Sequence, residues 1–324
     1  MKTVIVNGHT MNPGDVSWAS FEAFGPVKVF DYFTPENRKE VFQELAGAQA
    51  ALIQQTELDE AILAAGPRLK IISLTSTGYD RLRPEFLALA RERGVTVCNV
   101  AGYGTPAVSQ HTIALLLELC NRVAVHDEAV RQGRWGRGGE RFFWDYPLME
   151  LAGKTMGIIG FGEIGRAVAR IAGAFGMQVV THSAHVRPEY QKLAEYVSLD
   201  ELYHRAHVIS LHCPLKPETE QLINRESIAE MRDGALLLNT ARGGLLCERD
   251  VADALNCGKL GGAGLDVASV EPIRPDNPLL TAKNCVITPH LAWVPRETRQ
   301  RLIDCAAENL AAFLRGRPIH VINP

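Results

Sequence analysis

Three side chains in the second half of the chain could together bind a carbonyl substrate and donate a proton during its reduction. Arg242, Glu271 and His290 each follow closely after a run with the composition of a buried strand. Reduction of a keto acid needs a cation for the carboxylate and carbonyl oxygens, a proton donor, and a group that keeps this donor charged. Taken singly, each residue has an ordinary alternative, as a surface arginine, a solvated carboxylate or a capping histidine. Their common position at strand ends favours a catalytic site, because ligands of open α/β sheets bind at that edge.

The run Gly160-Phe161-Gly162-Glu163-Ile164-Gly165 has the spacing of a dinucleotide-binding loop. The spacing alone is weak evidence, but this run lies between a predicted buried strand and an alanine-rich predicted helix, Ile164 to Ala174. Gly160 would permit the tight turn, Gly162 the approach of the pyrophosphate, and Gly165 close packing of the helix. N–H groups at the helix N-terminus would bind the phosphates. The alternative is a structural turn that binds nothing.

The end of the next predicted strand bears on which dinucleotide is accepted. An acidic residue there would bind the ribose 2′-hydroxyl of NAD, but Ser183 occupies the position and no carboxylate lies between Val180 and Arg187. A carboxylate about 4 Å from a 2′-phosphate would cost on the order of 4 kcal/mol at an effective dielectric of about 20, and this penalty is missing. Ser183 and Arg187, with His182 or His185, would instead bind the phosphate. We therefore predict NAD or NADP as cofactor, with acceptance of NADP expected; the alternative is a solvated turn with an incidental arginine.

Two series of alternating strands and helices must position these residues. The first predicts strands at Thr3–Val6, Val27–Phe30, Ala51–Ile53, Leu69–Leu74 and Val95–Val100, with helices such as Glu36–Leu45 and Leu58–Ala65. The second predicts strands near Met156–Gly160, Gln178–His182, Val208–Cys213, Ala235–Asn239, Gly261–Asp266 and Cys285–Thr288. Strands that alternate with helices in this way are typical of doubly wound parallel sheets.

Two Rossmann-like α/β domains are therefore predicted. A doubly wound NAD(P)-binding domain would span residues 101–290, and a smaller, discontinuous, flavodoxin-like substrate domain would combine residues 1–100 and 291–324. A long buried helix opening at Thr105-Pro106 would lead into the cofactor domain. A helix from about Arg296 to Arg315 would pack back on the substrate domain, with its apolar face at Leu302, Ile303, Ala306, Leu310 and Phe313. We expect the reaction to occur in a cleft between the domains. Movement of the domains about a hinge near residues 100 and 290 would close this cleft.

The bulk composition fits a packed globular protein. At 324 residues the chain exceeds what one hydrophobic core usually serves, and no run approaches the roughly 20 apolar residues of a membrane span. The N-terminal run lacks the features of a secretory signal, and seven cysteines without a C-x-x-C pair predict a reducing cytoplasm and no metal site. A net charge of -3 without a basic run argues against nucleic-acid and membrane partners, so small molecules are expected.

Several blocks in combination resemble the D-isomer-specific 2-hydroxyacid dehydrogenase family. They are the glycine loop, Leu211-His212-Cys213-Pro214-Leu215, Asn239-Thr240-Ala241-Arg242-Gly243, Gly264-Leu265-Asp266-Val267 and Thr288-Pro289-His290. Thr77-Gly78-Tyr79-Asp80 and Val108-Ser109-Gln110-His111 also match, so the resemblance covers nearly the whole chain. Within the family the chain is most similar to the glycerate dehydrogenases, also called hydroxypyruvate reductases, partly for Asn12-Pro13-Gly14-Asp15-Val16-Ser17-Trp18 and His290-Leu291-Ala292-Trp293.

The resemblance implies a role for each catalytic candidate. Arg242 would bind the substrate carboxylate and carbonyl, and His290 would donate the proton in reduction. Glu271 would be the partner of His290 and would favour the imidazolium near neutral pH.

The same resemblance implies contacts for substrate and cofactor. Backbone N–H groups around Ser76, Thr77 and Gly78 would bind the substrate carboxylate, and Trp293 would either wall the pocket or serve only in packing. Asp266 would bind the nicotinamide carboxamide. Cys213 is expected to form part of the cofactor wall and not to act as a nucleophile. Besides the glycine loop, Ser183 and Arg187, the other residues expected to line the cofactor are Pro214, Thr219, Thr240, Ala241, His290 and Ala292.

Two functions remain open at this point. One is NAD(P)-dependent reduction of a small 2-keto acid, hydroxypyruvate or glyoxylate, to the D-2-hydroxy acid, with the reverse oxidation. For this enzyme the resemblance implies a homodimer built partly around the cofactor domain. The other is a nicotinamide-sensing regulator, since the resemblance extends to transcriptional corepressors. The lack of low-complexity segments favours the enzyme.

Overall fold

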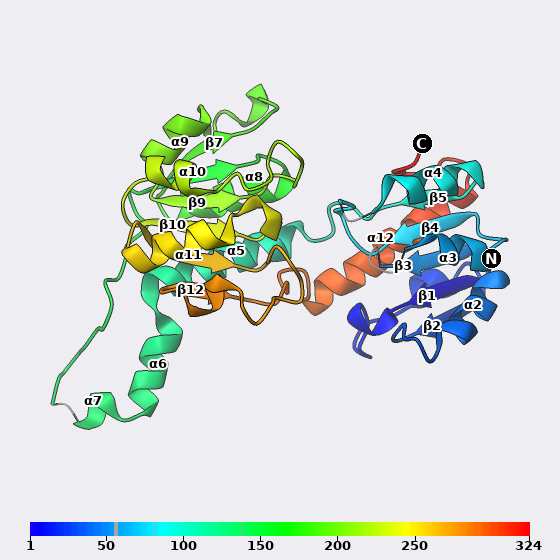
Figure 1. The fold of residues 1–324 in the computed structure, drawn as a ribbon, viewed down its shortest axis with the longest axis horizontal. Helices are drawn as coiled ribbons and strands as arrows, with labels where there is room; N and C mark the ends of the chain where they lie inside the picture. Colours follow the sequence, from blue (N-terminus) through cyan, green and yellow to red (C-terminus); the bar gives the residue numbers. More distant parts are fainter. Residues whose placement is uncertain (55–57, 81, 138) are drawn as a thin grey trace. The chain divides into compact units, whose positions relative to one another are not determined.

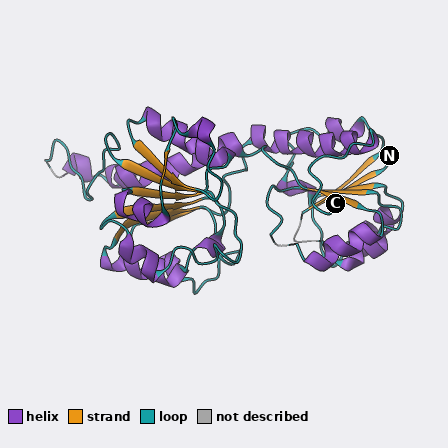
Figure 2. Ribbon diagram, turned by 90° about the horizontal axis from the view of Figure 1, so that it is seen from above, coloured by secondary structure: helices purple, strands orange, loops and turns teal. Residues whose placement is uncertain are grey.

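The computed structural model describes residues 1–54, 58–80, 82–137 and 139–324. It divides into two compact units, one formed by Met1–Gly104 with Trp293–Pro324 and the other by Thr105–Ala292 (Figure 1). Both units are α/β, with one parallel sheet each and helices on both faces of the sheet (Figure 2), so the predicted fold class is confirmed. Each unit is described by itself.

The first unit contains a five-stranded parallel sheet with the order β2-β1-β3-β4-β5, which is the flavodoxin-like order. Its strands are β1 (Thr3–Val6), β2 (Val27–Phe30), β3 (Ala50–Ile53), β4 (Ile71–Leu74) and β5 (Thr96–Cys98). Its helices are α1 (Ala19–Glu22), α2 (Arg38–Ala46), α3 (Glu60–Ala65), α4 (Pro84–Glu92) and α12 (Arg296–Leu314). Strands β1, β3 and β4 are buried along their whole length, as expected for a sheet covered on both faces.

Helix α12 completes the first unit although it lies at the far end of the sequence. Its buried residues Leu302, Ile303, Ala306 and Leu310 share a hydrophobic cluster with Ile5 and other residues from the first third of the chain. Helix α12 thus packs against the sheet of the first unit, where the last helix was expected.

The second unit contains a seven-stranded parallel sheet with the order β12-β11-β10-β9-β6-β7-β8. Its strands are β6 (Thr155–Ile159), β7 (Gln178–His182), β8 (Glu195–Tyr196), β9 (Val208–Leu211), β10 (Ala235–Asn239), β11 (Leu260–Leu265) and β12 (Cys285–Ile287). Its helices are α5 (Thr105–Asn121), α6 (Val123–Arg131), α7 (Arg134–Arg137), α8 (Glu163–Ala174), α9 (Leu199–Arg205), α10 (Arg225–Glu230) and α11 (Glu248–Cys257). Strand β8 was not predicted, because two residues at a sheet edge carry no readable periodicity.

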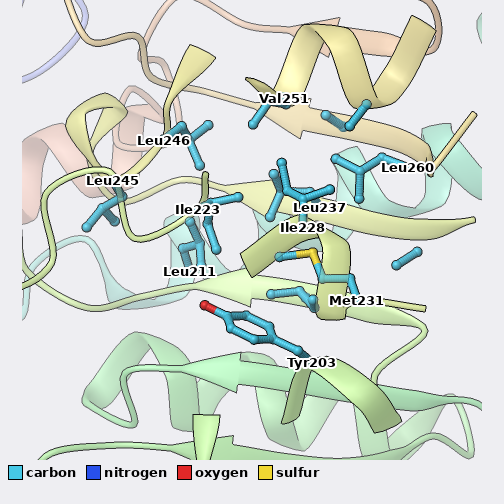
Figure 3. Close-up of a cluster of buried hydrophobic side chains, with 14 of the residues drawn as sticks. Tyr203, Leu211, Ile223, Ile228, Met231, Leu237, Leu245, Leu246, Val251 and Leu260 are labelled. Atoms are coloured by element: carbon cyan, nitrogen blue, oxygen red, sulfur yellow. The ribbon is translucent and has the colours of Figure 1, made fainter. Parts of the chain in front are cut away.

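Hydrophobic clusters cover both faces of this second sheet. On one face, Leu211 of β9 and Leu237 of β10 pack with Tyr203 of α9 and Val251 of α11 (Figure 3). On the other face, α5 and α8 bury their apolar residues against the strands. Within the described ranges, no helix combines the length and the apolar character needed to cross a membrane.

Candidate active site

The glycine loop lies where the strand order of the second sheet reverses direction. Strand β6 is followed in sequence by β7 on one side and later by β9 on the other. The N–H of Gly160 donates to the carbonyl of His182 at the end of β7, at 2.9 Å. Gly160 has φ 95°, and a Cβ there would lie 2.5 Å from the backbone nitrogen of Cys213 after β9. Only glycine fits this position, and such a reversal point is where open α/β sheets bind ligands.

The loop fits a dinucleotide phosphate. Gly162 caps helix α8 without a side-chain hydrogen bond, so the first N–H groups of the helix keep their capacity to bind an anion. A Cβ on Gly162 would meet no protein atom within 4 Å, so internal packing does not explain the glycine there. Its small size leaves room for a phosphate instead. Phe161, by contrast, turns its ring into the core against Tyr196 and offers a ligand only its backbone.

His290 and Glu271 form a hydrogen-bonded pair at the same edge of the sheet. The distance from His290 Nδ1 to Glu271 Oε2 is 2.9 Å, and the two side chains are 41% and 19% exposed. The other carboxylate oxygen of Glu271 accepts the N–H of Ala268 at 3.2 Å. Because Nδ1 faces the carboxylate, Nε2 is the ring nitrogen that remains for a substrate.

The backbone of His290 adopts an unusual conformation that its neighbours maintain. Its φ of 52° lies in the left-handed region, which residues other than glycine seldom adopt. The N–H of His290 donates to the carbonyl of Asp266 at 2.8 Å. The next two N–H groups, those of Leu291 and Ala292, donate to the Asp266 carboxylate at 2.9 Å each. Asp266 therefore fixes the orientation in which His290 leaves the sheet.

Asp266 is buried and ionised. Burial by itself would raise the pKa of this carboxyl, but hydrogen bonds from His111, Thr288 and the backbone N–H groups of Ala292 and Leu291 outweigh burial and lower the pKa. Thr288 Oγ1 donates at 2.6 Å, and His111 Nε2 lies 3.4 Å from Oδ1. The predicted contact of Asp266 with a nicotinamide carboxamide stays a prediction. Its role in holding the residues around His290 was missed, because motif spacing does not show which N–H groups a carboxylate receives.

Arg242 extends from a turn at the end of β10, the strand beside β11. The fully buried Asn239 shapes this turn: its Nδ2 donates to the carbonyl of Arg242 at 2.8 Å, and its Oδ1 accepts the N–H of Ala241 at 3.0 Å. Arg242 Nη1 donates to the carbonyl of Ala241 at 2.8 Å. The arginine is therefore preorganised by the protein and half-buried at the strand end.

Gly243 brings the Arg242 turn against the segment that leads to Glu271. A Cβ on Gly243 would lie 1.9 Å from the carbonyl carbon of Ala268 and 2.3 Å from the nitrogen of Ser269. Any other residue would force the two segments apart. The structure thus brings Arg242, Glu271 and His290 to one edge of one sheet, together with the glycine loop.

The loop predicted to bind the substrate carboxylate belongs to the first unit and follows β4. The carbonyl of Ser76 accepts the N–H of Val100 at 3.0 Å, and Ser76 Oγ donates to the carbonyl of Gly78 at 2.7 Å. Within the described residues, the N–H groups of Thr77 and Gly78 have no acceptor in the protein. Consecutive N–H groups of this kind form an anion-binding concavity.

Comparison with known proteins decides the family. Residues 113–292 match the model described as the NAD binding domain of D-isomer specific 2-hydroxyacid dehydrogenases. The chain belongs to this family. It is therefore an NAD(P)-dependent oxidoreductase, and the resemblance inferred from its motifs is confirmed.

Full-length relatives support the assignment. The dehydrogenase is 45% identical to a hydroxypyruvate reductase of Blautia hydrogenotrophica over 324 residues, which cover 100% of both chains. It is 35% identical to a glycerate dehydrogenase of Methylorubrum extorquens over 90% of this chain and 89% of that protein. Among solved structures, the TT0316 protein from Thermus thermophilus is 36% identical, with a TM-score of 0.83 over 99% of this chain and 100% of that chain.

Cys213 of this dehydrogenase borders the glycine loop, as the contact with Gly160 shows. Burial raises the pKa of its thiol to about 11. The thiol therefore stays protonated at neutral pH, which argues against a nucleophile, since the thiolate is the reactive form.

The predicted cofactor-lining threonines of the dehydrogenase use their hydroxyl groups to shape loops. Thr219 Oγ1 donates to the carbonyl of Pro214 at 2.8 Å, which closes the loop after β9. Thr240 Oγ1 lies 2.8 Å from Thr112 Oγ1 on α5. Ala241 packs partly buried against the core on one face of the sheet. Their contacts with a cofactor stay predictions.

Ser183 directly follows β7, beside the carbonyl that Gly160 binds. It is half-buried, whereas Arg187 is exposed and its backbone N–H lies 3.4 Å from the hydroxyl of Tyr196. In the folded protein, Ser183 therefore occupies the position directly after β7 where an acidic residue would bind the ribose of NAD.

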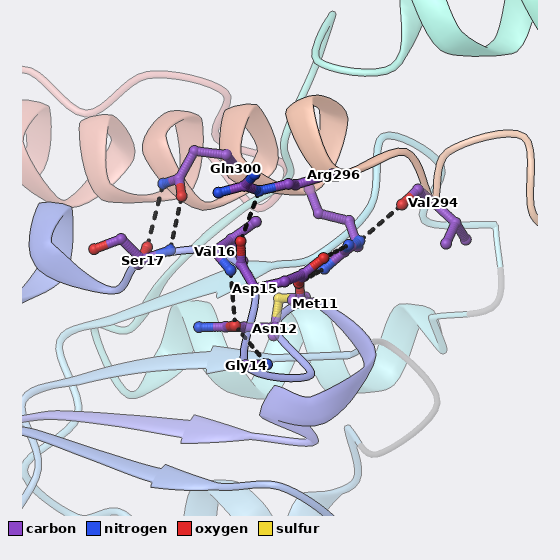
Figure 4. Close-up of polar contacts among 10 residues, drawn as sticks. Met11, Asn12, Gly14, Asp15, Val16, Ser17, Val294, Arg296 and Gln300 are labelled. Atoms are coloured by element: carbon purple, nitrogen blue, oxygen red, sulfur yellow. Dashed lines mark hydrogen bonds and ion pairs between the residues drawn. The ribbon is translucent and has the colours of Figure 1, made fainter.

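Trp293 packs, partly buried, against the hydrophobic core of the first unit. The next carbonyl, that of Val294, accepts a hydrogen bond from Arg299 Nε at 2.7 Å. Arg299 also forms a two-pronged ion pair with Asp15, at 2.7 and 2.6 Å, and thereby holds the loop Asn12–Trp18 against α12 (Figure 4). Packing at Trp293 is therefore observed, and its contact with substrate stays a prediction.

Proposed function

We propose that this dehydrogenase reduces hydroxypyruvate or glyoxylate to the D-2-hydroxy acid with a reduced nicotinamide dinucleotide, and catalyses the reverse oxidation. The hydrogen-bonded pair of His290 and Glu271, on the sheet edge that also carries Arg242 and the glycine loop, is the observation that carries this proposal. The names of the relatives, a hydroxypyruvate reductase and a glycerate dehydrogenase, support the choice of substrates.

The chain's own residues supply binding and proton transfer. Arg242 binds the carboxylate and polarises the carbonyl, which makes the carbonyl carbon more electrophilic. The bound dinucleotide supplies the hydride that adds to this carbon. His290 donates the Nε2 proton to the carbonyl oxygen, so that one hydride and one proton convert C=O to CH–OH, and the neutral imidazole regains its proton from solvent. Glu271 holds the imidazole ring through Nδ1, so that Nε2 faces the substrate.

Three further residues are proposed to bind the substrate. The N–H groups of Ser76, Thr77 and Gly78 would donate to the carboxylate, since those of Thr77 and Gly78 have no acceptor within the described residues. We also propose that Asp266 binds the nicotinamide carboxamide through its oxygens.

A panel of keto acids tests the proposed function. The purified protein is assayed with hydroxypyruvate, glyoxylate and pyruvate, each with NADH and NADPH, and binding of NADH is followed by its fluorescence. We expect the highest kcat/KM with hydroxypyruvate or glyoxylate. Binding of NADH without oxidation by any keto acid would instead favour the regulator, which none of the reported relatives supports.

Cofactor preference gives a separate prediction at Ser183. We expect the unmodified enzyme to use NADPH, and Ser183→Asp to lower kcat/KM for NADPH by about tenfold or more while NADH use changes little, because a carboxylate would repel the 2′-phosphate. The ratio of kcat/KM for NADPH and NADH measures this, with Ser183→Ala as the uncharged control. A strong preference of the unmodified enzyme for NADH would contradict the proposed acceptance of NADP.

We further propose a homodimer that forms through α6, α7 and the residues 139–146 that follow them. Figure 1 shows these helices extending from the seven-stranded sheet of the second unit. The segment exposes large apolar side chains, with Phe142 72% and Trp144 64% exposed, and exposed apolar patches of this kind mark interfaces. Light scattering should give twice the mass of the chain for the unmodified protein, and the chain mass for Phe142→Ser with Trp144→Ser. A monomeric unmodified protein at micromolar concentration would rule out this assembly.

A reducing compartment such as the cytoplasm is proposed as the location. All seven cysteines are unpaired in the structure, and two of them, Cys98 and Cys120, are buried.

A further inference from the structure

We propose that Asn309 and Asn99 are positioning residues for the substrate carboxylate. Together they would orient the peptide groups of the Ser76–Gly78 loop so that the N–H groups of Thr77 and Gly78 face the ligand. This inference rests on the proposed function, since it concerns the loop to which carboxylate binding is assigned.

The argument begins with the geometry of the trans peptide, in which C=O and N–H point in opposite directions. The carbonyl of Ser76 is held by the N–H of Val100 at 3.0 Å. The carbonyl of Thr77 is held by the side-chain Nδ2 of Asn99 at 2.6 Å. Both carbonyls are thus anchored to the two residues after β5, and the N–H groups of Thr77 and Gly78 must point away from them.

Two hydrogen bonds hold the backbone of Asn99 in place. Its carbonyl accepts a hydrogen bond from Asn309 Nδ2 at 2.8 Å, and its N–H donates to the carbonyl of His320 at 3.1 Å. The Asn99 backbone is therefore held at both polar atoms. Its side chain reaches Thr77 from a defined position instead of from a loose loop.

Both polar atoms of the Asn309 side chain form hydrogen bonds at this edge of the sheet. It is fully buried in α12, Nδ2 also lies 3.2 Å from Ser73 Oγ of β4, and Oδ1 pairs with His320 Nδ1 at 2.9 Å. A buried amide costs free energy unless it is hydrogen-bonded, and the partners of Asn309 meet this requirement. The Asn309 amide thus links β4 to Asn99, the residue after β5. The Ser76–Gly78 loop follows β4 and is bonded to Asn99 and Val100.

The chain contains a matched asparagine that lacks this link. Asn323 holds the same strand through an equivalent clamp: Oδ1 accepts the N–H of Val97 at 2.7 Å, and Nδ2 donates to the carbonyl of Val95 at 2.9 Å. No hydrogen bond joins Asn323 to the Ser76–Gly78 loop within the described residues. Asn323→Ala is therefore the control for a general loss of stability.

The test compares Asn99→Ala, Asn309→Asp and Asn323→Ala in steady-state kinetics with hydroxypyruvate and NADH. We expect Asn99→Ala to raise KM for the keto acid by about 3- to 10-fold, with kcat and the Kd of NADH nearly unchanged, as for loss of a group that only orients a binding contact. Asn309→Asp removes the donor to the Asn99 carbonyl and should raise the same KM. Asn323→Ala should lower the melting temperature and leave KM unchanged.

Amide hydrogen exchange supplies a readout besides activity. Exchange of the Thr77 and Gly78 amides should change in Asn99→Ala and stay as in the unmodified protein in Asn323→Ala. Equal KM values for Asn99→Ala and the unmodified enzyme would overturn the inference, as would an equal rise in KM for Asn323→Ala. If Asn309→Asp does not fold, Asn99→Ala still decides. If the unmodified protein reduces no keto acid, the proposed function itself fails, so the two failures are distinguishable.

Discussion

Replacement of His290 by alanine should lower kcat for keto-acid reduction about 10²- to 10⁴-fold while the Kd of NADH stays nearly the same. The hydride can add to the carbonyl carbon only as the oxygen gains a proton, and His290 is the group whose Nε2 remains for this step. Steady-state kinetics with hydroxypyruvate measure the loss, and fluorescence of NADH measures binding.

The chain offers a matched control for this substitution. His204 Nε2 lies 3.2 Å from a Glu230 carboxylate oxygen on the surface, which is also a histidine paired with a glutamate but away from the strand ends. His204→Ala should retain the activity of the unmodified enzyme. Near-normal turnover of His290→Ala would mean that another group donates the proton, and the assignment would be wrong.

Replacement of Arg242 by alanine should lower kcat/KM about 10²-fold or more. The guanidinium is proposed to bind the carboxylate and to stabilise the negative charge that develops on the carbonyl oxygen. Arg242→Lys should recover only part of the loss, because a lysine keeps the charge but not the planar pair of donors that matches a carboxylate.

Kinetics over a range of keto-acid concentrations separate the two contributions of Arg242. A rise in KM alone would indicate that the arginine only binds, whereas a fall in kcat shows stabilisation of the transition state. Arg225, an exposed arginine whose Nη2 lies 3.6 Å from Asp250, is the control, and Arg225→Ala should not change either constant. Unchanged kcat/KM for Arg242→Ala would remove this residue from the mechanism.

The sequence alone predicted the elements whose pattern is local. The strand before Gly160 and the helix after it are contiguous runs with clear composition, so the glycine loop could be placed between them, and the structure confirms that position. Strand ends were predicted to within a few residues for the same reason. Arg242, Glu271 and His290 were expected at one edge because parallel strands present their carboxyl ends together, and the structure places them at that edge.

The contacts that orient these residues could not be predicted. Asp266 receives N–H groups from the residues after His290, and Asn309 reaches Asn99 over 210 positions of sequence. Such pairs depend on which side chains of separate elements meet once the sheets have formed. A buried aspartate or asparagine in an otherwise apolar run is the available signal, but it does not name the partner.

The return of α12 to the first unit has a consequence for the order of folding during synthesis. Residues 105–292 form a contiguous unit that can fold as soon as it has left the ribosome. The five strands made earlier lack the face of their core that Leu302, Ile303 and Leu310 supply, so they must wait until the last helix has been translated. We therefore expect the domain made first to be completed last, with its exposed strands prone to aggregation until the last helix has been made.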